Sequence, residues 1–186
     1  MSSMLALGLA SYLSLYPVLL LPPMILLGYD RLARDSETPP PIGTFTIKYT
    51  GFFFASTAWL LYTSYILTGG SWEFLASTYG VHLLLPDLTP NVGLWWYFFI
   101  EMFDSFRDFF LGVFWLHLGG YVGGLCVRVR NQPLFIITCL LGIFAIFKPY
   151  PSISDTSLYF AMLPLYRHIF PCKFPHTLKT SMASLS

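Results

Sequence analysis

Long apolar stretches alternate with short polar segments along this chain of 186 residues. A helix of about 20 mostly apolar residues crosses the roughly 30 Å hydrocarbon core of a bilayer. Five stretches approach or reach that length: residues 4–29, 49–68, 109–127, 133–147 and 156–170. The pattern predicts an all-α, polytopic membrane protein with about five transmembrane helices.

Prolines interrupt two of these stretches. Pro17, Pro22 and Pro23 lie in the first, which we expect to be kinked or split because proline cannot donate a helical hydrogen bond. Pro164 lies in the fifth and weakest stretch. Within a membrane, neighbouring helices or a cavity must satisfy the freed backbone groups, so these helices are expected to have partners.

Residues 93–127 are too long for a single crossing, because one helix of that length would extend about 52 Å. The first half also holds four ionisable residues: Glu101, Asp104, Arg107 and Asp108. At the bilayer centre such a charge raises the free energy of membrane insertion by about 2.5–3.5 kcal/mol, whereas a Leu or Phe lowers it by only about 0.3–0.6 kcal/mol. We therefore predict an interfacial helix over residues 94–107 and a separate span over residues 109–127.

The composition supports a membrane environment. Charged residues make up 10% of the chain, against about 25% in a soluble domain. Aromatic residues reach 19%, and Trp95, Trp96 and Tyr97 are predicted to lie in an aromatic belt at the membrane interface. The net charge of +1 and the lack of a basic run give no reason to expect a nucleic-acid partner.

Basic residues divide unevenly between the two predicted sides of the membrane. Only Arg107 and Lys148 lie on one side, and the other eight lie opposite: Arg31, Arg34, Lys48, Arg128, Arg130, Arg167, Lys173 and Lys179. Cytosolic loops are enriched in Lys and Arg, so the loops after the first, third and fifth spans are predicted to be cytosolic. The amino terminus, the interfacial helix and residues 148–155 are then lumenal.

The membrane domain is expected to cover residues 1–171, followed by a polar, disordered tail over residues 172–186. Cys126, Cys139 and Cys172 form no CxxC pair and are expected to be small apolar residues. No nucleophile lies beside a base in a known motif, and no glycine-rich phosphate loop is present. The sequence therefore predicts no catalytic residues, no metal site and no cofactor.

Two polar clusters are candidates for binding. On one continuous helix Glu101, Asp104 and Asp108 would share a band of about 100°, with Arg107 beside it. Such a band fits a membrane-surface helix, an acidic surface that contacts a headgroup or another subunit, or an internal pair between Arg107 and a neighbouring aspartate. All three interpretations stay open at this point.

The second cluster lies between the fourth and fifth stretches and comprises Lys148, Tyr150, Ser152 and Asp155. This turn is bounded by prolines and could present a hydroxyl and a carboxylate to a lumenal ligand. The alternative is an ordinary tight loop in which Asp155 caps the next helix.

Three stretches resemble one family in order and content: ASYLSLYPVLLLPPMILL, PNVGLWWYFFIEMFDSFRDFFLGVFWLHL and IFAIFKPYPSISDTSLYFAMLPLYRH. They are similar to PIG-U, the multi-spanning subunit of the GPI transamidase, and most closely to its fungal members. The resemblance covers residues 5–171. Members of that family are considerably longer, so we expect this chain to represent part of one.

The resemblance implies a place in the endoplasmic reticulum complex that exchanges a C-terminal signal for a GPI anchor. The nucleophilic cysteine then belongs to a separate subunit, PIG-K, and this chain helps to recognise or position the GPI lipid or the attachment signal. The implied partners are PIG-K, PIG-T, PIG-S, a Gaa-type subunit and the GPI lipid. The two polar clusters are the candidate contacts with lipid or subunits.

A second hypothesis is a fragment of a polytopic glycosyltransferase that uses a dolichol-phosphate sugar. Such an enzyme needs lumenal carboxylates, for which Asp104, Asp108 and Asp155 are the candidates, although no paired motif joins them. A transporter fragment is suggested only by the broken helices, and no matching interruptions repeat in two halves of the chain.

Overall fold

The computed structural model describes residues 1–84 and 89–166, and all secondary structure in these ranges is helical. This confirms the predicted all-α class. Three helices form the first part: α1 (Ser2–Leu13), α2 (Leu21–Asp35) and α3 (Ile42–Leu67). The short helices α4 (Glu73–Leu75) and α5 (Val81–Leu84) follow. The remaining helices are α6 (Leu94–Ile100), α7 (Arg107–Arg128), α8 (Pro133–Phe147) and α9 (Ile153–Met162).

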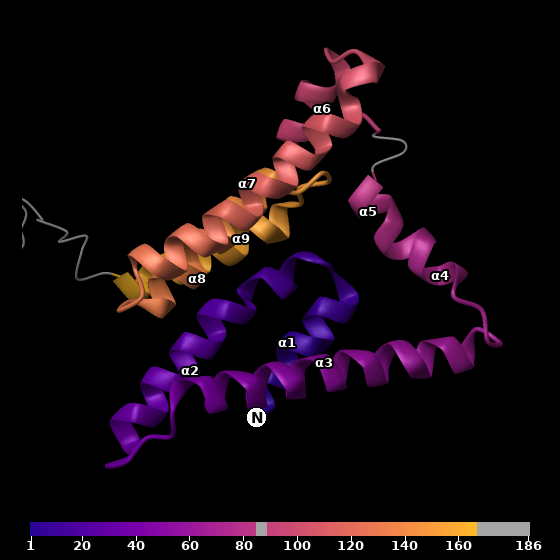
Figure 1. Cartoon of the computed structure of the whole chain (residues 1–186). Helices are drawn as coiled ribbons and strands as arrows, with labels where there is room; N and C mark the ends of the chain where they lie inside the picture. The colour runs from indigo at the N-terminus through magenta and orange to yellow at the C-terminus, as the bar shows by residue number, and fades with distance from the viewer. Residues whose placement is uncertain (85–88, 167–186) are drawn as a thin grey trace, which may run out of the picture.

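The first apolar stretch is split, as its prolines predicted. α1 ends at Leu13, Ser14 is extended, and a 3₁₀ turn over Tyr16–Leu20 leads into α2. Figure 1 shows α1 and α2 as two arms that meet at this bend. Residues 4–29 therefore do not form the single crossing that was predicted, because the break reverses the chain direction.

Both arms pack against α3, which is 26 residues long and extends for about 39 Å. Its start, Ile42, lies seven residues before the predicted start of this span, directly after the run of prolines at residues 39–41. α1 approaches α3 so closely that a Cβ atom at Gly8 would lie 2.6 Å from Ser56 Oγ. Small residues permit this kind of helix contact in membranes, where packing replaces the hydrophobic effect.

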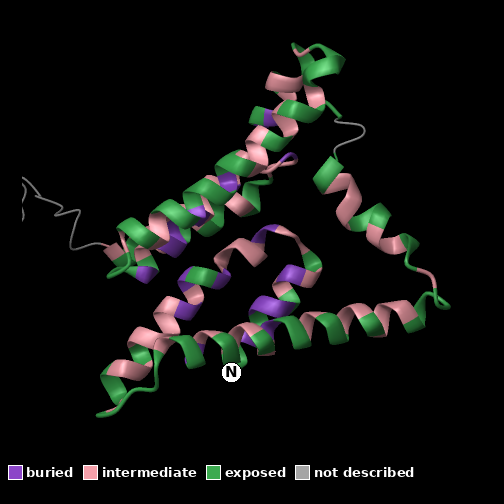
Figure 2. Cartoon of the chain, in the orientation of Figure 1, coloured by how far each residue is buried: buried purple, intermediate pink, exposed green. Residues whose placement is uncertain are grey.

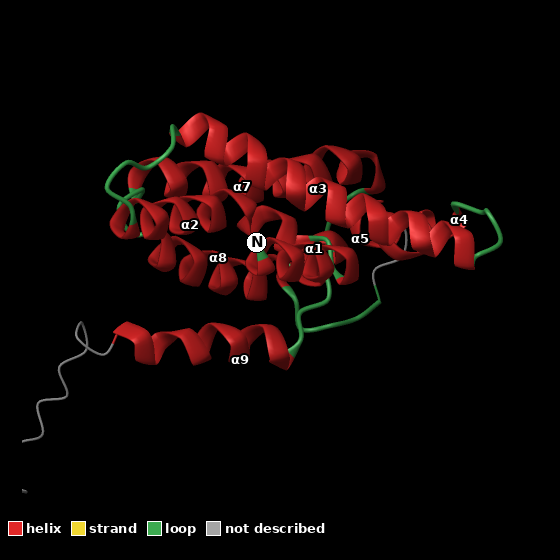
Figure 3. Cartoon of the chain, turned by 90° about the horizontal axis from the view of Figure 1, so that it is seen from below, coloured by secondary structure: helices red, strands yellow, loops and turns green. Residues whose placement is uncertain are grey.

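α7, α8 and α9 form the second part of the fold. α8 begins and ends at the residues predicted for the fourth span. α9 ends at Met162 and is followed by a 3₁₀ turn over Leu163–Tyr166, where Pro164 interrupts the α-helix. Figure 3 shows α9 on the outer side of α8. The rest of the predicted fifth span and the polar tail lie outside the described residues.

One helical segment among the described residues, Asp104–Arg128, is long and apolar enough to cross a membrane by length and composition. Ser2–Leu13 and Pro133–Phe147 are apolar but shorter. The number of spans therefore stays a prediction. Large apolar side chains are nevertheless exposed, including Leu116 at 73% and Trp59 at 67%. Figure 2 shows that exposed residues recur along all the long helices. A lipid environment accounts for this pattern better than water does.

The helices give the molecule two distinct ends. One end, called here the Arg34 end, holds the end of α2, the start of α3, the end of α7 and the start of α8 (Figure 1). The opposite end, called the Lys148 end, holds the start of α7, the end of α8 and the start of α9. α1 runs towards the Lys148 end, so the amino terminus lies away from it. The reversal made by α1 and α2 thus separates the amino terminus from the Lys148 end, and its predicted lumenal side stays a prediction.

Candidate functional site

Tyr16 lies at the centre of the Lys148 end, where the three family-like stretches meet. The 3₁₀ turn after α1 carries Tyr16 against α7 and α8, and its side chain is 3% exposed. Its ring stacks on Trp115 of α7 at a centroid distance of 5.8 Å and packs at a tilt on Phe144 of α8 at 5.9 Å. The three aromatic rings thus join residues from distant parts of the sequence.

Trp95 attaches α6 to the same end. It is fully buried, its indole nitrogen donates to the carbonyl oxygen of Phe147 at 2.5 Å, and its ring lies 4.6 Å from Phe114. The burial of Trp95 within the protein disagrees with its predicted place in an aromatic belt at the membrane interface. Tyr97 on the same helix is 59% exposed and agrees with that prediction. The aromatic residues of α6 therefore lie on two faces, one packed against the protein at Trp95 and one exposed at Tyr97.

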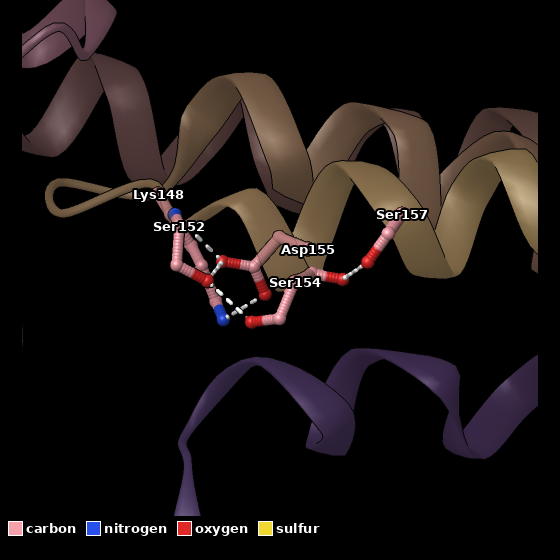
Figure 4. Close-up of polar contacts among 5 residues, drawn as sticks. All are labelled: Lys148, Ser152, Ser154, Asp155 and Ser157. Carbon is pink, nitrogen blue, oxygen red and sulfur yellow. Dashed lines mark hydrogen bonds and ion pairs between the residues drawn. The ribbon is translucent and has the colours of Figure 1, made fainter.

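The turn between α8 and α9 is held by an ion pair and a capping box (Figure 4). Lys148 Nζ donates to Asp155 Oδ1 at 2.5 Å, and the two side chains are 22% and 18% exposed. Asp155 Oδ2 accepts hydrogen bonds from the backbone nitrogen of Ser152 at 3.1 Å and from its hydroxyl at 2.9 Å. This geometry favours the interpretation in which Asp155 caps α9.

Hydrogen bonding also fixes the protonation state of Asp155. Partial burial on its own raises the pKa of this carboxyl, but the hydrogen bonds from Lys148 and Ser152 and the charge of Lys148 together lower the pKa below its usual value. A carboxylate held in this way stays ionised near neutral pH and is a weak base. Asp155 therefore suits a structural or ligand-orienting role better than the role of a general base.

A small cavity of about 70 Å³ adjoins the ion pair. Its wall contains Lys148 and six other residues: Ser14, Leu15, Tyr16, His82, Pro149 and Tyr150. The Tyr16 hydroxyl is buried and has no hydrogen-bond partner in the structure, although Lys148 Nζ lies 5.7 Å from the centre of its ring. A buried hydroxyl without a partner is unfavourable, and such a cavity has room for a water or a small polar group of a ligand.

The acidic stretch does not form the continuous helix over residues 94–107 that was predicted. α6 ends at Ile100, Phe103 is extended, and a 3₁₀ turn over Asp104–Phe106 leads into α7 at Arg107. The chain folds back here because Phe98 of α6 packs on Phe110 and Phe114 of α7, at 5.4 and 5.1 Å.

The predicted acidic band is consequently replaced by an exposed hairpin tip. Glu101, Asp104 and Asp108 are exposed, and Arg107 is half-buried. Asp108 lies in the first turn of α7, where a negative charge interacts favourably with the helix dipole. The two predicted clusters thus occupy the same end of the molecule but come from different turns.

Sequence reasoning included Lys148, Tyr150, Ser152 and Asp155 but missed Tyr16 and His82, which lie beside them. His82 packs edge-on against the Tyr150 ring at 6.3 Å. The Ser152-x-x-Asp155 spacing is a capping-box signature and could have revealed the role of Ser152. No local pattern connects Tyr16 with Lys148. Within the described ranges, no three His, Cys, Asp or Glu side chains are grouped so as to hold a metal ion.

Comparison with known proteins shows the family to which the chain belongs. The family model described as GPI transamidase subunit PIG-U matches residues 1–185. The GPI-anchor transamidase component PIGU of Mus musculus is 36% identical over 169 residues, which are 88% of this chain and 38% of the relative. The GPI transamidase component GAB1 of Saccharomyces cerevisiae is 34% identical over 168 residues, 90% of this chain and 40% of the relative. The chain therefore spans about two fifths of the length of these curated relatives.

Proposed function

Because the chain belongs to the PIG-U family of GPI transamidase subunits, we propose that it acts as a non-catalytic membrane subunit of that complex. In this role it helps to recognise or position the GPI lipid or the C-terminal attachment signal. Its location is the endoplasmic reticulum membrane, which it crosses several times. Its partners are PIG-K, PIG-T, PIG-S, a Gaa-type subunit and the GPI lipid.

The convergence of the three family-like stretches at the Lys148 end is the observation that carries this proposal. Tyr16, Trp115 and Phe144 come from the three stretches and are in direct ring contact. Beside them lie the buried Tyr16 hydroxyl, the Lys148–Asp155 pair and a small cavity. This end offers polar groups at the boundary of an apolar helix bundle, which suits the headgroup of a glycolipid or a polar part of a partner.

The separation of charges supports a lumenal position for the Lys148 end. Arg34 and Arg128 lie in the last turns of α2 and α7, at the Arg34 end. The exposed Glu101, Asp104 and Asp108 lie at the opposite end. Basic residues favour the cytosolic side, so the acidic tip and Lys148 face the lumen, where attachment of the anchor takes place.

Catalysis is assigned to a different subunit. Cys126 and Cys139 are half-buried on α7 and α8, within the apolar bundle, and Asp155 is engaged by Lys148 and Ser152. A nucleophile needs a base oriented towards it. We propose that the reacting cysteine belongs to PIG-K and that this chain contributes positioning.

Charge reversal at the acidic tip, the exposed hairpin that carries Glu101, Asp104 and Asp108, tests whether these residues contact lipid or another subunit. In a full-length context, Glu101→Lys and Asp108→Lys should reduce co-purification of PIG-K or the surface level of a GPI-anchored reporter. Glu37→Lys, an exposed acid in the loop at the Arg34 end, is the matched control and should change neither. Wild-type values of both readouts in the two tip variants would contradict the proposed contacts.

A further inference from the structure

A cavity of about 670 Å³ with several charged residues in its wall lies at the Arg34 end, on the opposite side of the molecule from the candidate site. The end of α2 forms one wall and the start of α8 forms another. The polar wall residues are Asp30, Arg31, Arg34, Asp35, Asn131 and Gln132. Apolar residues, among them Leu27, Leu134 and Phe135, complete the lining.

The charged side chains of this cavity have no net formal charge, and its arginines are free to contact a ligand. Two arginines and two aspartates line it, so their formal charges cancel. Arg31 and Arg34 are exposed and have no ion-pair partner among residues 1–84 and 89–166. Guanidinium groups bind phosphate oxygens well, and carboxylates bind an ammonium group.

The start of α8 adds a favourable field for an anion. No side chain caps the first turn of this helix, which begins at Pro133 and borders the cavity. The unpaired backbone N–H groups of a helix start carry a partial positive charge. Together with Arg31 and Arg34, this helix start favours a phosphate as the anionic part of the ligand.

An apolar groove of about 740 Å³ adjoins this cavity and shares Phe135 and Tyr166 with it. α8 and α9 form its walls, with α7 at the edge. Along α8 the groove extends from Phe135 to Ile146, a rise of about 17 Å. One leaflet of the hydrocarbon core is about 15 Å deep, so the groove matches the depth of one leaflet.

We propose that these two connected cavities bind one glycerophospholipid whose headgroup carries a phosphate and an amine, as in phosphatidylethanolamine. Its phosphate contacts Arg31, Arg34 and the start of α8, and its amine contacts Asp30 and Asp35. One acyl chain occupies the groove between α8 and α9. The headgroup cavity lies at the end opposite to Lys148 and shares no wall residue with the small cavity beside Tyr16, whereas the groove extends along α8 as far as Ile146.

Native mass spectrometry of the whole chain in detergent tests this proposal. The chain is delipidated and titrated with dioleoyl phosphatidylethanolamine, dioleoyl phosphatidylglycerol or dioleoylglycerol. We expect one tightly bound phosphatidylethanolamine, weaker binding of phosphatidylglycerol and the weakest binding of dioleoylglycerol, which has no headgroup. The double variant Arg31→Gln/Arg34→Gln should weaken phosphatidylethanolamine binding at least about tenfold.

Two further variants separate headgroup recognition from general lipid adhesion. Arg128→Gln removes an exposed arginine at the same end but outside both cavities, and should bind like the wild type. Ile146→Trp fills the groove from an exposed position and should weaken binding of all three lipids.

Equal binding by the arginine double variant and the wild type would overturn the headgroup site, as would equal binding of dioleoylglycerol and phosphatidylethanolamine. Unchanged binding by Ile146→Trp would overturn the acyl-chain groove. Loss of the lipid when the chain is purified with its partner subunits would instead identify the groove as a protein interface. None of these outcomes depends on GPI attachment, so they are independent of the proposed function.

Discussion

The indole nitrogen of Trp95 lies 2.5 Å from the carbonyl oxygen of Phe147, the last residue of α8. This hydrogen bond satisfies a backbone acceptor at a helix end, where the final carbonyls have no partner within the helix. It also attaches the aromatic helix α6 to the turn that carries Lys148. Trp95 therefore helps to set the position of the acidic tip relative to the Lys148–Asp155 pair, together with the contacts of Phe98 with Phe110 and Phe114.

Replacing Trp95 by phenylalanine should destabilise the protein. The Trp95→Phe variant keeps an aromatic ring but leaves the Phe147 carbonyl unpaired, which costs about 1–3 kcal/mol for a buried group. The expected result is a lower thermal unfolding temperature in detergent. Trp59→Phe on α3 is the control, because Trp59 is 67% exposed, and its unfolding temperature should match the wild type.

The stabilisation that Asp155 gives to the folded protein should be lost at acid pH. Its pKa is lowered in the folded protein by Lys148 and Ser152, so the ionised form is favoured by folding. The stabilisation is present above the usual Asp pKa of about 3.9 and is lost as the pH falls through the lower folded value. At pH 7 Asp155→Asn should unfold at a lower temperature than the wild type, and this difference should shrink in acid. A difference that stays constant from neutral pH to pH 2 would contradict the ion pair.

Removing the Tyr16 hydroxyl should reduce anchor attachment without reducing the stability of the protein. Tyr16→Phe keeps the ring contacts with Trp115 and Phe144 and removes a buried hydroxyl that has no partner. The unfolding temperature should stay the same or rise, since the desolvation penalty disappears. In a full-length context the surface level of a GPI-anchored reporter should fall at least about twofold if the hydroxyl binds a ligand group.

Tyr62→Phe is the matched control for this experiment, because Tyr62 is 52% exposed on α3. It should leave both the unfolding temperature and the reporter unchanged. Normal reporter levels in Tyr16→Phe would show that the hydroxyl has no part in anchor attachment.

Glycine is required at position 93 by close contact with the α8–α9 turn. A Cβ atom at this position would lie 2.7 Å from Cδ of Pro151, whose ring cannot move aside. Gly93→Ala should therefore destabilise the protein by about 1–3 kcal/mol. In Gly120→Ala the new methyl group meets open space, and the variant should be as stable as the wild type or slightly more stable.

A second substitution tests the cause of that effect. Pro151→Ala removes the ring atoms that a Cβ at position 93 would meet and leaves Asn91 Oδ1, which would lie 2.7 Å from that Cβ. Thermal unfolding of the double variant should show a smaller loss from Gly93→Ala than in the wild-type background. An equal loss in both backgrounds would place the cause elsewhere.

Labelling with a membrane-impermeant thiol reagent should reveal the orientation of the two ends. In a chain whose native cysteines are replaced by serine, Arg34→Cys should react from the cytosolic side of intact microsomes. Glu101→Cys should react only after the membrane is permeabilised, because the acidic tip is proposed to be lumenal. Reaction of Glu101→Cys in intact microsomes would exclude the orientation and the proposed role of the tip.

Local sequence patterns predicted several parts of the structure well. α8 has its predicted bounds because Pro133 and the Lys148-Pro149 pair mark its ends within a continuous apolar run. The split near Pro17 was also predicted, since proline acts on the backbone around it. The Lys148 turn was recognised because its polar residues are close together in the chain.

The reversals of the chain were not predicted. The prolines indicate where the first stretch breaks, but contacts with α3 determine that α1 and α2 become two arms. Likewise, the charges from Glu101 to Asp108 predict that the segment avoids the bilayer centre. The contact of Phe98 with Phe114 decides that it folds into a hairpin.

The sequence by itself therefore determined the helical class, the family and most helix positions, because transfer free energies and backbone preferences belong to individual residues and their neighbours. Tertiary structure alone decided that Trp95 is buried, that Tyr16 lies beside Lys148, and that Arg31 and Arg34 border a cavity at the start of α8. These relationships depend on which helices pack together, and that choice rests on contacts between distant parts of the chain.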